Sequence, residues 1–217
     1  MNKFSKTYGY ADRLFWGWRI KDFNNGSFQG LTYTFSEIKY NPVFKSLYLK
    51  HNENNELDTA LDACIEGAFK SLLKGSTQEA FPNEKSFCVT ATLLYDLLYS
   101  LEKCGKLDNL TSQQLSILEK SSKYISKHIE KHANIGNHLV SALCALYIYY
   151  EKLGNQSKEV NNGIELILTK LNNIWCEEGW FEEYGGSDVG YLTLSLQYLT
   201  RIDSQDFKEK EIWNEKI

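Results

Sequence analysis

The sequence predicts an all-α protein, an incomplete α/α toroid of helical hairpins with a repeat of about 52 residues. The first supporting observation is that the starts of three apolar segments align in two adjacent columns, formed by Ser86, His138 and Gly190 and by Phe87, Leu139 and Tyr191. The second is that amphipathic and apolar helix patterns alternate three times. The third is a composition of 42% hydrophobic residues with only two prolines, which is typical of a folded helical chain.

The helices follow from hydrophobic periodicity and from residues that start or stop helices. The expected outer, amphipathic helices cover residues 57–73, 111–132 and 157–175. The expected inner, apolar helices cover residues 86–103, 137–153 and 189–202. Gly75 ends the first outer helix, and Thr111 or Ser112 caps the second. The outer two copies of the repeat align Gly75 with Gly179.

The chain is expected to form a single domain with three parts. Residues 1–56 form an irregular aromatic segment packed on the toroid, with further helices or short strands and a polar loop over 51–56. Residues 57–202 contain the toroid hairpins, and residues 203–217 form a charged tail or surface helix.

Composition and charge restrict the partners and the location. The net charge is −4 and the lysines are scattered, so we expect no nucleic-acid partner, which would need a clustered basic surface. No apolar stretch approaches the roughly 20 residues that span a bilayer, and no signal peptide is apparent. The five cysteines lie in apolar helix patterns, so we expect buried free thiols. These features predict a cytoplasmic protein without a membrane span.

The segments that precede the inner helices are expected to meet at one end of the barrel. Glu79, Phe81, Glu84 and Trp180 lie in these segments and are candidate substrate-binding residues. Carboxylates and aromatic rings together suit a saccharide, and helix N-termini also favour anionic groups such as a uronate or phosphate.

His138 is the sharpest catalytic candidate, as a general base or as a group that neutralises a carboxylate. The alternative is a structural histidine near a helix cap. Glu183 and Asp188 form a candidate acid and base pair for glycoside hydrolysis, although acidic residues at helix starts also serve as caps. Widely spaced Cys88, His138 and Cys176 are a weak zinc signal, so we expect neither a metal nor a cofactor.

The chain resembles helical-toroid proteins of polysaccharide metabolism. The resemblance rests on the segments 137–143, 179–186 and 190–193, which read NHLVSAL, GWFEEYGG and GYLT. It is closest to the α/α-toroid domain of the heparinase II/III-like and alginate-lyase-like polysaccharide lyases, and looser to terpenoid-cyclase-like toroids. In such lyases an Asn and a His neutralise the uronate carboxylate, which implies Asn137 and His138 here, with Tyr184 or Tyr191 for proton transfer. The lyases contain more hairpins and usually a following β-sandwich.

The sequence therefore predicts a carbohydrate-processing protein, a lyase or hydrolase acting on an acidic or surface polysaccharide. The alternative is a non-catalytic helical scaffold that binds a glycan or a protein. A partner chain or a second copy of this chain is expected to complete the toroid.

Overall fold

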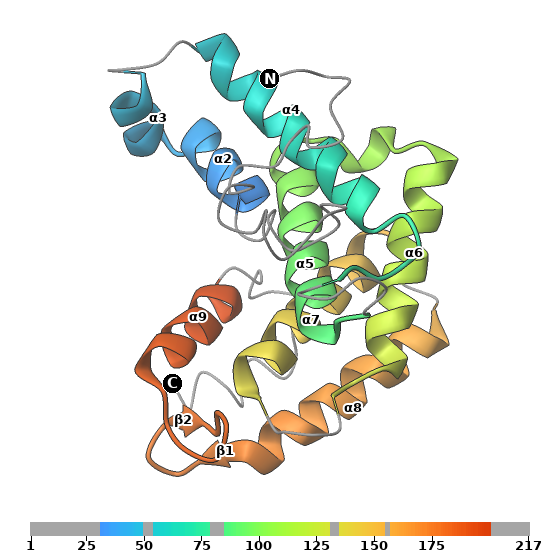
Figure 1. The fold of residues 1–217 in the computed structure, drawn as a ribbon, viewed down its shortest axis with the longest axis vertical. Coiled ribbons are helices and arrows are strands. Elements are labelled where there is room, and N and C mark those ends of the chain that lie inside the picture. Colours follow the sequence, from blue (N-terminus) through green and yellow to red (C-terminus); the bar gives the residue numbers. More distant parts are fainter. Residues whose placement is uncertain (1–30, 50–53, 79–84, 131–134, 155–156, 201–217) are drawn as a thin grey trace.

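The part of the chain that the computed structural model describes is built almost entirely from α-helices (Figure 1). It comprises residues 31–49, 54–78, 85–130, 135–154 and 157–200. The elements in these residues are α2 (Leu31–Tyr40), α3 (Pro42–Tyr48), α4 (Asn54–Ser71), α5 (Phe87–Lys103), the 3-10 turn η2 (Leu107–Asn109), α6 (Ser112–Lys127), α7 (Gly136–Lys152), α8 (Lys158–Ile174), β1 (Trp175–Cys176), β2 (Trp180–Phe181) and α9 (Val189–Leu199). The predicted all-α class is confirmed.

The core lies between α5 and α7, which form the most extensive interface between two helices. Thirteen of the seventeen residues are buried in each, so neither helix has a continuous solvent face. Both are rich in Leu and Tyr, and the remaining helices surround them (Figure 1). These are the helices that the sequence predicted as apolar and internal.

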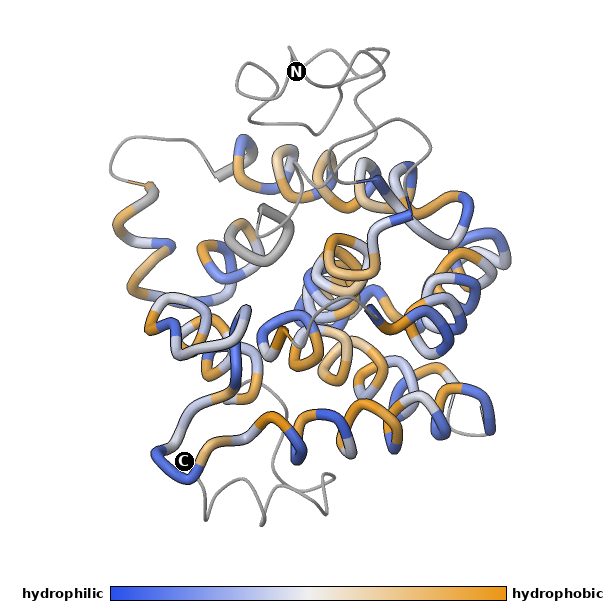
Figure 2. The backbone as a smooth tube through the Cα atoms, turned by 60° about the horizontal axis from the view of Figure 1, so that its bottom comes forward, coloured by the Kyte–Doolittle hydropathy of each residue, from blue (hydrophilic) through white to orange (hydrophobic). Residues whose placement is uncertain are grey.

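The helices α6 and α8 are amphipathic and pack against each other outside this core. The buried residues of α8 recur every three or four positions. Hydrophobic and hydrophilic residues therefore alternate along α8, at the lower edge of Figure 2. A Cβ at Gly163 of α8 would lie 2.6 Å from the Ser126 Cβ of α6, so glycine permits the close approach. Of the two predicted caps, Thr111 is the one that caps α6, in a reciprocal arrangement with Gln114.

The last inner helix differs from the prediction. The helix α9 packs on α7, but Val189 is 81% exposed and only Ser195, Tyr198 and Leu199 are buried within it. Extensive contacts of α9 with a second helix are not found in the described residues. The buried residues lie near the C-terminal end of α9, where the Tyr198 ring is 4.8 Å from the Tyr95 ring of α5 in an edge-to-face arrangement.

The N-terminal region contains helices where the sequence left open helices or short strands. The helix α2 packs on α4 and α5, and the Asn41 side chain caps α3 by accepting bonds from the N–H groups of Val43 and Phe44. Residues 54–56 belong to α4, so the predicted polar loop is wrong there. The aromatic segment before residue 31 and the charged segment 203–217 lie outside the described residues, and the three-part division stays a prediction.

None of the five cysteines forms a disulfide bond. Cys64 and Cys144 are buried, as predicted, and burial raises the pKa of the Cys64 thiol to about 12. Cys88, Cys104 and Cys176 are partly exposed, so the prediction of buried thiols is wrong for these three.

None of the described helices is long and apolar enough to cross a membrane.

Candidate functional site

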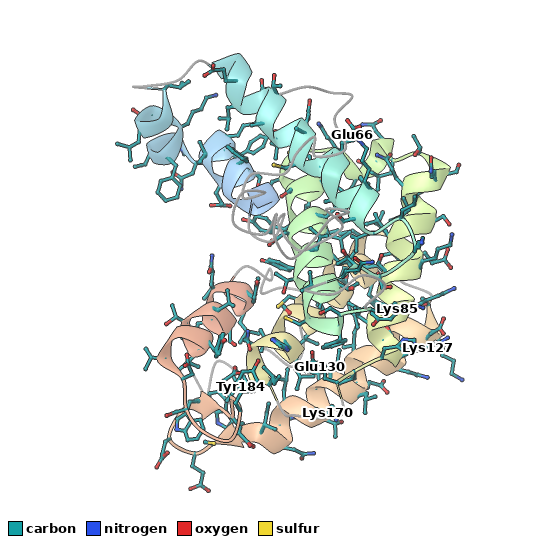
Figure 3. The ribbon with its side chains drawn as sticks, in the orientation of Figure 1. Glu66, Lys85, Lys127, Glu130, Lys170 and Tyr184 are labelled. Carbon is teal, nitrogen blue, oxygen red and sulfur yellow. The ribbon has the colours of Figure 1, made fainter. Side chains whose placement is uncertain are left out.

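The N-terminal ends of α7 and α9 meet at one end of the helical array, and α5 begins on the side of this end that faces α6. Ile135, just before α7, forms an isolated β-bridge with Glu183 in the segment that leads to α9. Tyr184 in that segment interacts electrostatically with Cys88 at the start of α5 and with Glu130. We call this region the mouth and define it by Glu130, Asn137, His138, Glu183, Tyr184, Asp188 and Tyr191. Figure 3 shows Glu130 and Tyr184 beside the starts of α7 and α9.

A short β-hairpin carries the chain from α8 to the mouth. The strands β1 and β2 are antiparallel, with Trp175 opposite Phe181 and their rings 4.9 Å apart in an edge-to-face arrangement. The chain then passes so close to α7 that a Cβ at Gly136 would lie 2.5 Å from the Phe181 Cβ. Glycine at position 136 is therefore required for the hairpin to reach the start of α7.

Glu183, which follows the hairpin, caps the N-terminal end of α7. Its Oε1 atom accepts a 2.7 Å hydrogen bond from the Asn137 N–H, and the carboxylate also interacts with the Gly136 N–H. The side chain is 5% exposed, and burial raises the pKa of Glu183 despite these bonds and the nearby His138. Glu183 Oε2 and Asn137 Oδ1 are buried and have no hydrogen-bond partner within the described part of the chain.

The other two inner helices are capped by residues next to them in sequence. Asp188 Oδ1 accepts a 2.8 Å bond from the Tyr191 N–H at the start of α9. Ser86 Oγ accepts a 3.2 Å bond from the Val89 N–H at the start of α5. Each of the three helix starts thus has a side-chain oxygen of the protein on it, which leaves fewer N–H groups for an anionic ligand.

His138 is held by a carboxylate that sequence reasoning did not identify. Its Nδ1 atom lies 2.8 Å from Glu130 Oε2, and the two side chains are 14% and 16% exposed. A carboxylate acceptor at Nδ1 keeps the proton there and leaves Nε2 as the basic nitrogen of the neutral ring. Glu130 follows α6 and lies eight residues before His138. No local motif marks it, because the pair depends on how the chain runs between α6 and α7.

Two tyrosines of the mouth, Tyr184 and Tyr191, are exposed. Glu183 and Gly186 exchange backbone hydrogen bonds around Tyr184 and Gly185, whose φ angles are +54° and +88°. Two positive φ angles in succession are typical of a type I′ turn. The Tyr184 side chain at this turn is 64% exposed, and its ring lies 6.1 Å from the Tyr191 ring. Desolvation, followed by the neighbouring Tyr191, Cys88, Glu130 and Glu183, raises the pKa of Tyr184, so its phenol stays protonated at neutral pH.

The predicted substrate-binding residues are not among those that define the mouth. Trp180 lies in β2, and its Nε1–H donates to Glu178 Oε2 at 3.0 Å. Glu79, Phe81 and Glu84 lie outside the described residues. Across the residues that are described, no three His, Cys, Asp or Glu side chains come together as ligands for a metal ion.

Comparisons with protein-family models, with curated protein sequences and with solved structures find no match to this chain. The resemblance to polysaccharide lyases therefore stays a prediction from the sequence.

Proposed function

We propose that this chain is a carbohydrate-processing protein and that its mouth holds a polysaccharide. The observation that carries the proposal is the exposed Tyr184 and Tyr191 pair beside the His138–Glu130 pair. Aromatic rings offer an apolar face to the C–H groups of a sugar, and carboxylates and an imidazole bind its hydroxyl groups. One base within reach of a bound sugar is the minimum that proton transfer requires.

His138 is the proposed general base. The 2.8 Å contact of Nδ1 with Glu130 orients the ring and stabilises the imidazolium that forms when Nε2 takes a proton. In a lyase, this proton comes from the carbon next to a uronate carboxylate. Tyr184, whose pKa is raised, then serves as a proton donor and not as a base. In a hydrolase, His138 activates the attacking water.

The resemblance assigns neutralisation of a uronate to Asn137, and the hydrolase hypothesis assigns acid and base roles to Glu183 and Asp188. Asn137 is 6% exposed, and its N–H is bonded to Glu183. Glu183 is also buried, although a raised pKa suits a general acid. Either residue has to become exposed before it can reach a sugar.

The proposed scaffold is the incomplete α/α toroid with its repeat of about 52 residues. Contacts of α5 with α7 and of α7 with α9 give a row of inner helices, and α6 and α8 pack beside it. The aligned Gly75 and Gly179 both have positive φ angles, +84° and +92°, which supports equivalent positions in two copies. A saccharide, a partner chain or second copy that completes the ring, and a cytoplasmic location belong to this proposal.

A non-catalytic glycan-binding scaffold is the second candidate. It is favoured by one observation, that Glu183 and Asp188 both cap helices and are thus occupied structurally. In this case the tyrosines bind the glycan, and the His138–Glu130 pair fixes the start of α7.

The test incubates the full chain with a panel of uronate-containing, neutral and amino-sugar polysaccharides. Unsaturated product is followed by ultraviolet absorbance, and new chain ends are followed by a reducing-sugar assay. We expect the product to fall at least about 100-fold in His138→Ala and to be partly retained in Glu130→Gln. His128→Ala is the matched control, because His128 ends α6, is exposed and stacks on Tyr124.

Equal product from His138→Ala and the unmodified chain would disprove catalysis at the mouth. A folded chain that binds a polysaccharide but releases no product would favour the second candidate.

A further inference from the structure

The inner helices bring no Lys or Arg side chain to the mouth. Among the residues of α5, α7 and α9, the Lys and Arg residues are Lys103 and Lys152, and each is the last residue of its helix. Both therefore lie at the end of the array opposite to the mouth. Of the three lysines that Figure 3 labels, Lys85 and Lys127 lie toward α6, away from Tyr184, and Lys170 belongs to α8.

The segment that links α8 to α9 is acidic. Residues 171–200 contain no Lys or Arg, and their acidic residues are Glu177, Glu178, Glu182, Glu183 and Asp188. Asp188 contributes to raising the pKa of Glu183, and Glu130 and Glu183 both act on Tyr184. The carboxylates of the mouth thus share one electrostatic environment around the exposed tyrosines.

The helix starts offer few free N–H groups to an anionic ligand. Backbone N–H groups bind anions at such positions, but Ser86, Glu183 and Asp188 already accept bonds from N–H groups at the three starts. Two of these three caps are carboxylates, so they add negative charge where a uronate would have to bind. His138 is the single described group of the mouth that can become positive, and it is already paired with Glu130.

We infer that the mouth selects a saccharide that carries protonated amines, as an amino-sugar polymer does, and disfavours one that carries uronates. The tyrosine pair contacts the sugar rings, and Glu130 and Asp188 attract the ammonium groups. This inference rests on the proposed function and specifies the charge of its substrate. It also makes β-elimination from a uronate the less favoured reaction.

The experiment measures binding of three β-linked hexasaccharides by isothermal titration calorimetry with the full chain. The hexamers consist of glucosamine, glucose or glucuronate, and the pH keeps the amines protonated and the carboxylates ionised. At low salt we expect the glucosamine hexamer to bind about tenfold more tightly than the glucose hexamer, and the glucuronate hexamer about tenfold more weakly. High salt should reduce both differences, because it screens exposed charges.

Two variants remove charge and keep the hydrogen-bond acceptor. Asp188→Asn preserves the cap of α9, and Glu130→Gln preserves an acceptor for His138. Each should lower the preference for glucosamine over glucose about threefold. Asp62→Asn is the matched control, because Asp62 of α4 pairs with Lys106, which follows the C-terminal end of α5.

The outcomes separate the two proposals. Tighter binding of the glucuronate hexamer, or a glucosamine preference that both variants retain in full, would overturn the inference while carbohydrate binding stands. Equal binding of the glucose and glucosamine hexamers at low salt would also overturn it. If none of the three hexamers binds, both the inference and the proposed function fail.

Discussion

The starts of α7 and α9 are both capped by a carboxylate, but the two carboxylates come from different distances along the chain. Asp188 directly precedes α9, is exposed and bonds an N–H three residues ahead. Glu183 bonds the Asn137 N–H across 46 residues and is 5% exposed. The local cap stabilises its own helix, whereas the distant cap also fixes the α8–α9 connection against α7. The same kind of hydrogen bond thus stabilises one helix at α9 and joins two distant segments at α7.

The largest effect should come from Gly136→Ala, which blocks the approach that the distant cap needs. The new Cβ would lie 2.5 Å from the Phe181 Cβ and 2.9 Å from Glu183 Oε1. We expect the free energy of unfolding to fall by about 3 kcal/mol in chemical denaturation. Gly186→Ala is the control, since a Cβ there meets no atom within 4 Å, and its effect should stay under about 0.5 kcal/mol. Similar losses in the two variants would refute the close approach.

Glu183→Ala should lower the free energy of unfolding by about 2 kcal/mol, because it leaves buried N–H groups at the start of α7 without an acceptor. Glu182→Ala changes the neighbouring, half-buried carboxylate and should have little effect. The protection of the first-turn amides of α7 against hydrogen exchange should fall in the first variant only. Unchanged protection in Glu183→Ala would show that the cap is dispensable.

The distant cap should also depend on pH. The pKa of Glu183 is raised in the folded state, so the folded protein binds this proton more strongly than the unfolded chain. The stability advantage over Glu183→Gln is therefore largest at or below the ordinary value of 4.5 and decreases as the pH rises through the raised pKa. Denaturation of both proteins over this range measures the difference, and an advantage that grows with pH would contradict the raised pKa.

Asp188→Ala should have a smaller effect, about 1 kcal/mol, because it removes one exposed, local cap. Asp188→Asn keeps an acceptor and should restore most of this stability. Thermal unfolding of the two variants tests the comparison with Glu183. A loss at Asp188 as large as that at Glu183 would mean that burial adds nothing to the cap.

The smallest effect should be a gain from Tyr184→Asn. Tyrosine has a positive φ of +54° here, a conformation that asparagine adopts more easily. We expect a gain of about 0.5 kcal/mol in stability together with weaker binding of the hexasaccharides. Gly185→Ala, at a φ of +88°, should instead lose stability. If Tyr184→Asn binds the hexasaccharides with unchanged affinity, the Tyr184 ring does not contact the glycan.

The local features of the fold were predictable from the sequence because they depend on neighbouring residues. Ser86 and Ser157 precede long periodic segments, and α5 and α8 begin directly after them. The helix α6 ends at Lys127, before the predicted end at residue 132, because Ile129 turns inward and Glu130 pairs with His138. The exposure of α9 depends on which helices lie beside it, and periodicity does not contain that information.

In the candidate site, too, the local features could be predicted from the sequence and the contacts between distant segments could not. The sequence placed His138, Glu183 and Asp188 near inner-helix starts, and it included helix capping among the roles of the acidic residues. That Asp188 caps α9 follows from adjacent residues. The partner of His138 and the helix that Glu183 caps depend on contacts between distant segments, which a single sequence does not specify.

The distance between Glu183 and Asn137 also has a consequence for the order of folding during synthesis. The residue that completes the start of α7 is translated 46 positions after Asn137. The nascent α7 can pack on α5 as soon as both have emerged, but its first turn stays open until the β-hairpin has been made and docked. Between the emergence of α7 from the ribosome and that of the β-hairpin, the chain would therefore hold a formed α5–α7 pair whose first α7 turn is still frayed at His138, so the mouth is completed last.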